Sequence, residues 1–143
     1  MSTSVGTESE AQVAGKTGGW LAVEVSRQVS APLAHVWEVL VSPEGSSALL
    51  GDGAVLGGKG EPYHCVDGTS GVLRSFHPLE QIRVSFHETP DSTPSMVEVD
   101  LRADGDDTRV ELRHDRIADE QRRTALERRW SGGLEALACA ATD

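Results

Sequence analysis

The sequence predicts an α+β domain in which an antiparallel sheet of about six to seven strands packs against one long C-terminal helix. Three observations lead to this class. Apolar and polar residues alternate near the N-terminus and again through the middle of the chain, which is the period of half-buried strands. Two short segments with helical spacing follow the first alternating run, and the C-terminal end carries a single apolar stripe at helical spacing.

The first element should be a strand that begins at Trp20, because Leu21 and Val23 alternate with small or polar residues. Residues 1–19 show no periodicity and are rich in Ser, Thr, Gly and Glu. That composition is typical of a disordered tail, because it offers too little apolar surface to bury. The predicted domain therefore spans residues 20–143.

Two short helices should follow this strand. Ser30 is a suitable N-cap and Pro32 suits a first helical turn, and apolar residues at helical spacing continue until Pro43 stops the run. A second brief helix is expected over residues 43–50, ended by Gly51.

The middle of the chain should form consecutive strands. Turn signals such as Asp67-Gly68 and His77-Pro78 separate the alternating runs. Short connections of this kind produce an antiparallel meander with one face in water. The expected strands cover residues 63–66, 71–76, 82–86, 97–101 and 110–112.

A long helix is expected over residues 119–141, with acidic residues in its first turn. Gly133 interrupts its apolar stripe and should cost up to about 1 kcal/mol relative to alanine. Either a close approach by another element or simple tolerance explains this glycine. The stripe consists of Leu126, Trp130, Leu134, Leu137 and Ala141.

Charge and composition exclude several classes of partner. The chain of 143 residues has 13 Lys and Arg against 23 Asp and Glu, a formal net charge of -10. This balance repels phosphate backbones, so neither nucleic acid nor an anionic membrane is an expected partner. No signal-peptide pattern and no apolar run of membrane length occur, so a cytoplasmic location is expected. The cations are almost all arginine, a bias typical of GC-rich bacterial genomes.

Neither a metal nor a cofactor is expected. Cys65 and Cys139 lie far apart and outside any ligand spacing, which indicates neither a disulfide framework nor a zinc site. The stretch GAVLGGKG, residues 53–60, contains the G-x-x-x-x-G-K of a P-loop, but Gly60 stands where Ser or Thr would bind magnesium. A P-loop also needs a helix start at this point. Because Pro62 and a strand-like run follow, a glycine turn without nucleotide binding is predicted.

Four stretches resemble the sequence motifs of one family and occur in the same order. VSAPLAHVWEVLVSPEG, GVLRSFHPLEQIRVSF, DTRVELRH and RWSGGLEAL are similar to motifs of bacterial proteins related to the C-terminal domain of the Hsp90 ATPase activator, in the START/SRPBCC superfamily. The resemblance covers residues 23–138. It implies a helix-grip fold of the START and birch-allergen kind, in which a curved sheet wraps the long helix around an apolar cavity. This chain departs from the motifs at Leu49, where tryptophan is usual, and at Arg129, which replaces a glycine.

Alternation identifies the side chains that should face this cavity. They either line a ligand site or close over one another as core. The inward strand residues are Val84, Phe86, Val97, Val99, Leu101, Val110 and Leu112, and the helix adds Trp130, Leu134 and Leu137, with Trp37 a further candidate.

Polar candidates complete the expected site. The same parity places His114 inward, where it would orient a carbonyl, act as an acid or base, or sit as a hydrogen-bonded strand-end histidine. Tyr63 and Arg74 come next. The register around Arg74 is open, because a slip of one residue exchanges Val72, Arg74 and Phe76 for Leu73, Ser75 and His77. The candidate ligand-binding set is therefore Trp37, Tyr63, Arg74, Phe76, Phe86, Val99, Leu112, His114, Trp130 and Leu134.

Three functions fit the resemblance. The first is binding of a small apolar or amphipathic molecule in the cavity between the sheet and the helix, without covalent chemistry. The second is an enzyme of the polyketide-cyclase or hydrolase kind that uses His114 with Tyr63 or Arg74. The third is a chaperone-associated protein-interaction domain. The sequence specifies no oligomeric state.

Overall fold

The computed structural model describes residues 21–89 and 91–142. The predicted tail, residues 1–19, and the expected start of order at residue 20 lie outside the described residues. The described elements follow the predicted order. They are β2 (Leu21–Val29), α2 (Leu33–Val41), α3 (Pro43–Leu50), β3 (Pro62–His64), β4 (Ser70–His77), β5 (Gln81–Phe86), β6 (Ser95–Asp104), β7 (Asp107–Ile117) and α4 (Glu120–Thr142).

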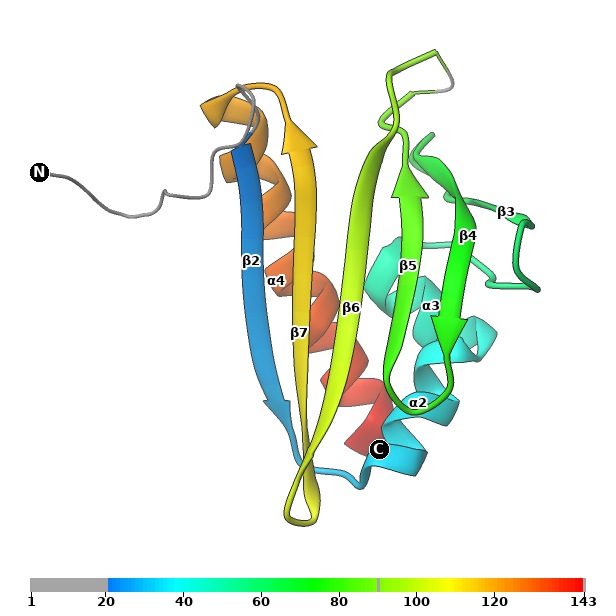
Figure 1. Ribbon diagram of the computed structural model, residues 1–143, viewed down its shortest axis with the longest axis vertical. Helices are drawn as coiled ribbons and strands as arrows, with labels where there is room; N and C mark the ends of the chain where they lie inside the picture. The colour runs from blue at the N-terminus through cyan, green and yellow to red at the C-terminus, as the bar shows by residue number, and fades with distance from the viewer. Residues whose placement is uncertain (1–20, 90, 143) are drawn as a thin grey trace, which may run out of the picture.

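The strands form one antiparallel sheet of six strands in the order β2-β7-β6-β5-β4-β3. In Figure 1 the curved sheet lies in front, α4 runs behind it along β2 and β7, and α2 and α3 lie beside α4 on the same side. The predicted α+β class, with a sheet that wraps one long helix, is confirmed. We call the side of the sheet that α4 covers the inner face.

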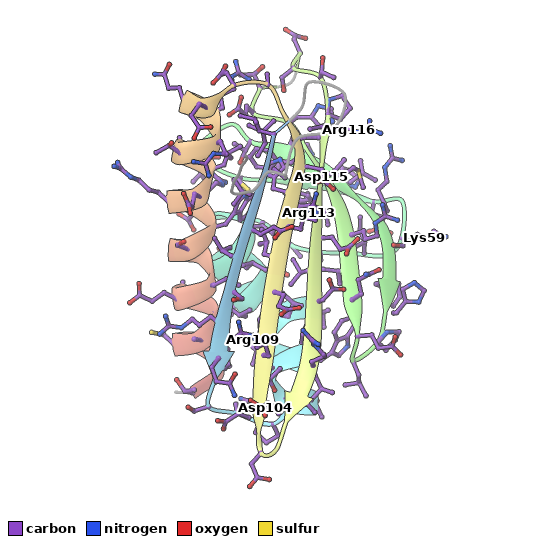
Figure 2. All side chains as sticks on the ribbon, turned by 60° about the vertical axis from the view of Figure 1, so that its left-hand side comes forward. Lys59, Asp104, Arg109, Arg113, Asp115 and Arg116 are labelled. Atoms are coloured by element: carbon purple, nitrogen blue, oxygen red, sulfur yellow. The ribbon has the colours of Figure 1, made fainter. Side chains whose placement is uncertain are left out.

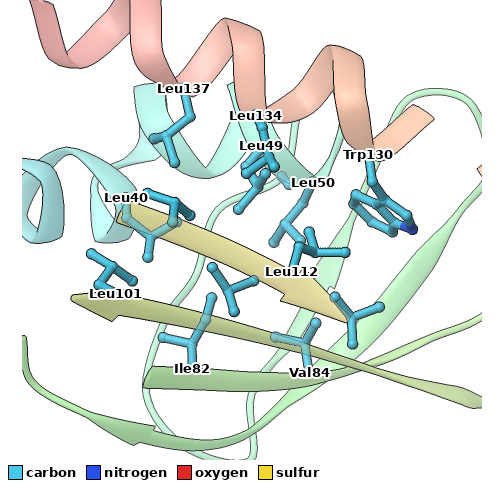
Figure 3. Packing of buried hydrophobic residues seen from close by; sticks show 14 of the residues in the cluster. Leu40, Leu49, Leu50, Ile82, Val84, Leu101, Leu112, Trp130, Leu134 and Leu137 are labelled. Carbon is cyan, nitrogen blue, oxygen red and sulfur yellow. The ribbon is translucent and has the colours of Figure 1, made fainter. Parts of the chain in front are cut away.

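The inner face carries the apolar residues that alternation predicts. In β6 and β7 the pairs include Val97 with His114 and Val99 with Leu112, and directly paired residues of antiparallel strands share a face. All the strand residues predicted to face inward are buried, as are Trp130, Leu134 and Leu137 of α4. Figure 3 shows the α4 side chains directed at the strand residues beneath them.

The outer face is charged. Arg113 pairs with Glu24 of β2 and with Asp115 of its own strand, and Arg83 of β5 pairs with Glu98 of β6. In Figure 2 the labelled Arg109 and Arg113 of β7 lie on the face of the sheet away from α4. Exposed pairs of this kind add little stability, so the fold depends on its inner face.

The register of β4 corrects one prediction. Leu73 is paired with Val84 and buried, but the pairing shifts before Ser75, so that Phe76 is paired with Ile82. Arg74 lies at this irregularity and is exposed. Of the two registers left open, the one that turns Arg74 inward does not hold here, because the strand contains an extra residue, and Arg74 does not belong in the candidate ligand-binding set.

Phe76 is also not part of the interior. By register it shares the side of buried Ile82, yet 43% of it is exposed. The reason is that β3 pairs with β4 only as far as Val72, so Phe76 lies on a strand without an outer neighbour. Neither register left open by the sequence holds along the whole strand.

The structure explains Gly133 and the glycine-rich stretch 53–60. A Cβ on Gly133 would lie 2.5 Å from the carbonyl oxygen of Leu49, so the glycine permits a close approach of α3 to α4. The stretch 53–60 consists of turns and irregular backbone that lead into β3, not a helix. The prediction that these residues form a glycine turn and do not begin a helix is confirmed.

Candidate functional site

His114 is a fully buried polar group of the inner face, with 0% exposure. The indole Nε1–H of Trp130 donates to His114 Nδ1 at 2.9 Å, and Nε2 lies 2.6 Å from Ser95 Oγ. An indole nitrogen can only donate. Nδ1 must therefore carry no proton, and Nε2 carries the proton that it donates to Ser95.

The electrostatic surroundings keep this imidazole neutral. Burial, followed by the positive charge of Arg129, lowers the pKa of His114 from 6.5 to about 4. At neutral pH the ring is thus an uncharged hydrogen-bond relay between Trp130 and Ser95.

Aromatic packing fills the space around His114. The ring of Phe86 lies 5.1 Å from that of His114 and 5.6 Å from that of Trp130, both edge to face. The third pair, His114 and Trp130, has centroids 5.8 Å apart. In this part of the fold, the residues that were predicted to line a cavity pack against one another as core.

Arg129 closes the same region from the side of α3 and the turn between β3 and β4. Its guanidinium lies 5.3 Å from the ring centroid of Phe86 and 5.5 Å from that of Trp130, within the range of cation–π attraction. The same group donates to Asp67 at 2.8 Å, to the Leu50 carbonyl at 2.8 Å and to Thr69 at 3.0 Å.

The partners of Arg129 respond to it. Hydrogen bonds from Thr69, and then from Arg129, lower the pKa of Asp67 to about 2. The sequence marks Arg129 only as a departure from the family motif. Arg129 fills this side of the interior through contacts with residues that are distant in the sequence. No local sequence pattern predicts these contacts.

Tyr63 is buried but belongs to a separate group. Its hydroxyl donates to the Ser85 carbonyl at 2.9 Å, and burial raises its pKa. A Cβ on Gly71 would lie 2.6 Å from the tyrosine ring, so the glycine makes room for it. Tyr63 and His114 share no hydrogen-bond partner among the described residues, and with Arg74 exposed the three predicted polar groups do not converge.

A pocket of about 480 Å³ opens at the end of the sheet where β5 and β7 finish and α4 begins. We call it the end pocket. Phe86, Ile117 and Leu126 give it buried apolar walls, and Ser95 connects it to His114. The remaining lining residues are Glu88, Asp91, Ser92, Thr93, Pro94, Arg116, Ala118, Asp119 and Arg122.

The end pocket contains one member of the predicted ligand-binding set, Phe86. Trp37 is half-buried beside the core. Four others, Val99, Leu112, Trp130 and Leu134, are buried in the core, and His114 lies behind Ser95.

Apart from Phe86, the residues that line the end pocket were not in the predicted ligand-binding set; Ser95 and Ile117 are two of them. Strand parity carries a usable signal for Ser95, since it lies two positions before Val97.

No site for a metal ion is found within the described ranges, where no three His, Cys, Asp or Glu side chains are grouped to hold one. Over the same ranges, no helix has the length and apolar character needed to cross a bilayer.

No protein-family model matches the sequence. No curated protein matches it either. Solved structures do. The chain is similar to CalU16 from Micromonospora echinospora, with a TM-score of 0.69 and 20% identity over 84% of this chain and 75% of that one.

Two further structures support the same arrangement. The Aha1 dimer from Colwellia psychrerythraea gives a TM-score of 0.72 at 12% identity, covering 85% of this chain and 96% of that one. DynU16, encoded in the dynemicin biosynthetic locus, gives 0.71 at 18% identity, and the matched part is 86% of this chain but 47% of DynU16. At these identities the likeness concerns the fold. The helix-grip fold implied by the sequence motifs is confirmed.

Proposed function

We propose that this protein binds a small amphipathic molecule in the end pocket and performs no covalent chemistry on it. The observation that carries the proposal is the pocket itself. Its volume of about 480 Å³ lies in the usual range of small-molecule sites, and such sites combine apolar walls with a few fixed polar groups. Phe86, Ile117 and Leu126 supply the walls, and Ser95 is the fixed polar group.

The position of this site differs from the position that the sequence suggests. The space between the sheet and the middle of α4 is occupied by Trp130, Phe86 and His114. A ligand would therefore lie at the first turns of α4, with Phe86 as the boundary between the pocket and the core. The sequence motifs favour membership of the bacterial proteins related to the Hsp90 activator domain. We propose this membership as well.

The geometry favours binding over acid–base catalysis. A serine nucleophile needs a histidine whose facing nitrogen accepts the hydroxyl proton. Here Nε2 carries a proton toward Ser95, because Trp130 occupies Nδ1. The Ser95–His114 contact is thus arranged as a hydrogen-bond relay and not as a general-base pair.

The test is displacement of a neutral fluorescent probe, N-phenyl-1-naphthylamine, from purified protein. Ala118 is exposed and lines the end pocket, so Ala118→Phe should fill it and weaken probe binding at least tenfold. Ala103 is an exposed alanine of β6 outside the pocket, and Ala103→Phe is the matched control that should leave binding unchanged. Equal binding by the two variants and the unmodified protein would show that the probe sits elsewhere and would overturn the proposal.

A further inference from the structure

We propose that the end pocket selects ligands whose polar group is a hydrogen-bond donor, such as an alcohol, a phenol or an amine, and that Ser95 Oγ accepts this bond. The inference rests on the proposed function, since it concerns the same pocket. It follows from the directions of the hydrogen bonds behind the pocket and from the charges at its entrance.

The hydrogen bonds from Trp130 through His114 to Ser95 run in one direction. The indole of Trp130 has an N–H and no acceptor, so the proton on the 2.9 Å bond belongs to Trp130. A neutral imidazole carries one proton, which must then be on Nε2. Ser95 Oγ therefore accepts from His114 across 2.6 Å.

Ser95 Oγ can accept one further hydrogen bond. A hydroxyl has one proton and two lone pairs. Its proton is directed to the Phe86 carbonyl at 3.3 Å, and one lone pair is taken by His114. One lone pair remains, and Ser95 lines the end pocket. The inner end of the pocket thus presents an acceptor.

The surrounding groups disfavour the opposite direction of the hydrogen bond between Ser95 and His114. If Ser95 donated to His114, the imidazole proton would have to move to Nδ1, where it would face the Trp130 N–H in a fully buried position. Two donors pointed at each other leave both unsatisfied. A charged ring with protons on both nitrogens meets the same obstacle, and burial and Arg129 oppose that charge.

The charged residues that line the end pocket carry a small net negative charge. Glu88, Asp91 and Asp119 line the end pocket against Arg116 and Arg122, so the formal sum is two positive minus three negative charges, or one negative. Arg122 is held by Glu88 at 2.6 Å and lies 3.7 Å from Asp119. Because this arginine already has acidic partners, the entrance favours a neutral or cationic donor over a carboxylate.

The experiment compares naphthalenes of similar shape that differ in their polar group. Isothermal titration at pH 7 measures 2-naphthol, 2-methoxynaphthalene and 2-naphthoate against the full chain. We expect 2-naphthol to bind at least tenfold more tightly than 2-methoxynaphthalene, although the ether is the more apolar compound. Ser95→Ala should remove this preference while leaving the affinity for the ether within about twofold, since the ether has no proton to donate to Ser95.

Thr93→Val is the matched control. Thr93 is an exposed pocket residue, and its loss of a hydroxyl should leave the preference for naphthol intact. Circular dichroism confirms that each variant is folded. Equal binding of naphthol and its ether, or tighter binding of naphthoate, would overturn the donor inference while leaving the pocket as the site. Binding of none of the three compounds would overturn both proposals.

Discussion

Trp130 donates its indole N–H to Nδ1 of His114 across 2.9 Å, and both side chains are fully buried. Trp130→Phe removes the donor and leaves a buried acceptor without a partner. We expect the free energy of unfolding to fall by about 1–3 kcal/mol, because an unsatisfied buried polar group costs its desolvation. Urea denaturation followed by circular dichroism measures this loss.

The same bond makes a spectroscopic prediction. Nitrogen chemical shifts of the His114 ring in the unmodified protein should show a protonated Nε2 and an unprotonated Nδ1 at pH 7. In Trp130→Phe the Nδ1 atom of His114 no longer accepts a hydrogen bond from the indole. A mixture of the two neutral tautomers is therefore expected. A protonated Nδ1 in the unmodified protein would contradict the hydrogen-bond directions on which the site depends.

His114 should also make stability depend on pH. Its pKa falls from 6.5 to about 4 on folding, so the folded state binds fewer protons than the unfolded chain between these values. The contribution is complete above pH 6.5 and is lost as the pH falls toward 4. A shift of this size corresponds to a loss on the order of 3 kcal/mol. Urea midpoints at pH 7, 6, 5 and 4 follow it.

The control for this pH dependence is His114→Gln, whose amide oxygen can still accept from Trp130 but does not titrate. Other titrating groups change the stability of both proteins alike. One of them is Glu98, because burial and Asp100 raise its pKa. The variant should be less stable at pH 7 and lose less stability on acidification. Parallel pH curves for the two proteins would assign the effect to other residues.

Most of the fold could be predicted because its signals are local. Strand alternation and helical spacing are properties of neighbouring residues, and the second short helix spans residues 43–50 as expected. The irregularity in β4 could not be predicted in this way. It is a property of the pairing between β4 and β5, and the residues of β4 alone do not specify which β5 residues they pair with.

The site could be predicted only in part for a related reason. Strand parity places His114 on the inner face, and helical spacing places Trp130 opposite it. Which nitrogen of His114 meets the indole depends on how α4 is rotated against the sheet, and that is set by packing along the whole helix. The position of the end pocket depends on which large side chains fill the space between the sheet and α4, and the family resemblance implied a cavity there without placing it along the helix.

Gly133 and its neighbour Gly132 offer a matched pair of substitutions. A Cβ on Gly133 would lie 2.5 Å from the Leu49 carbonyl oxygen, whereas a Cβ on Gly132 would meet nothing within 4 Å. Gly133→Ala should destabilise the protein by about 1–3 kcal/mol or more, because α3 and α4 must separate. Gly132→Ala should stabilise it by about 0.5–1 kcal/mol, because alanine is the better helix former.

Thermal or urea unfolding of the two glycine variants decides between close approach and tolerance. Opposite signs are expected from the same chemical change one residue apart. If Gly133→Ala proved as stable as Gly132→Ala, the contact between α3 and α4 would be looser than the structure shows.

Arg129 should stabilise the fold through its hydrogen bonds more than through its charge. Arg129→Met keeps an unbranched stem against Phe86 and Trp130 but loses the bonds to Asp67, Thr69 and the Leu50 carbonyl. A loss of about 1–3 kcal/mol is expected, because the carbonyl is left without this donor. The pKa of Asp67 should rise in the variant, since Arg129 helps to lower it, and NMR titration of the carboxyl measures that change. An unchanged pKa together with unchanged stability would mean that water replaces the guanidinium without cost and that Arg129 is dispensable for closing this side of the interior.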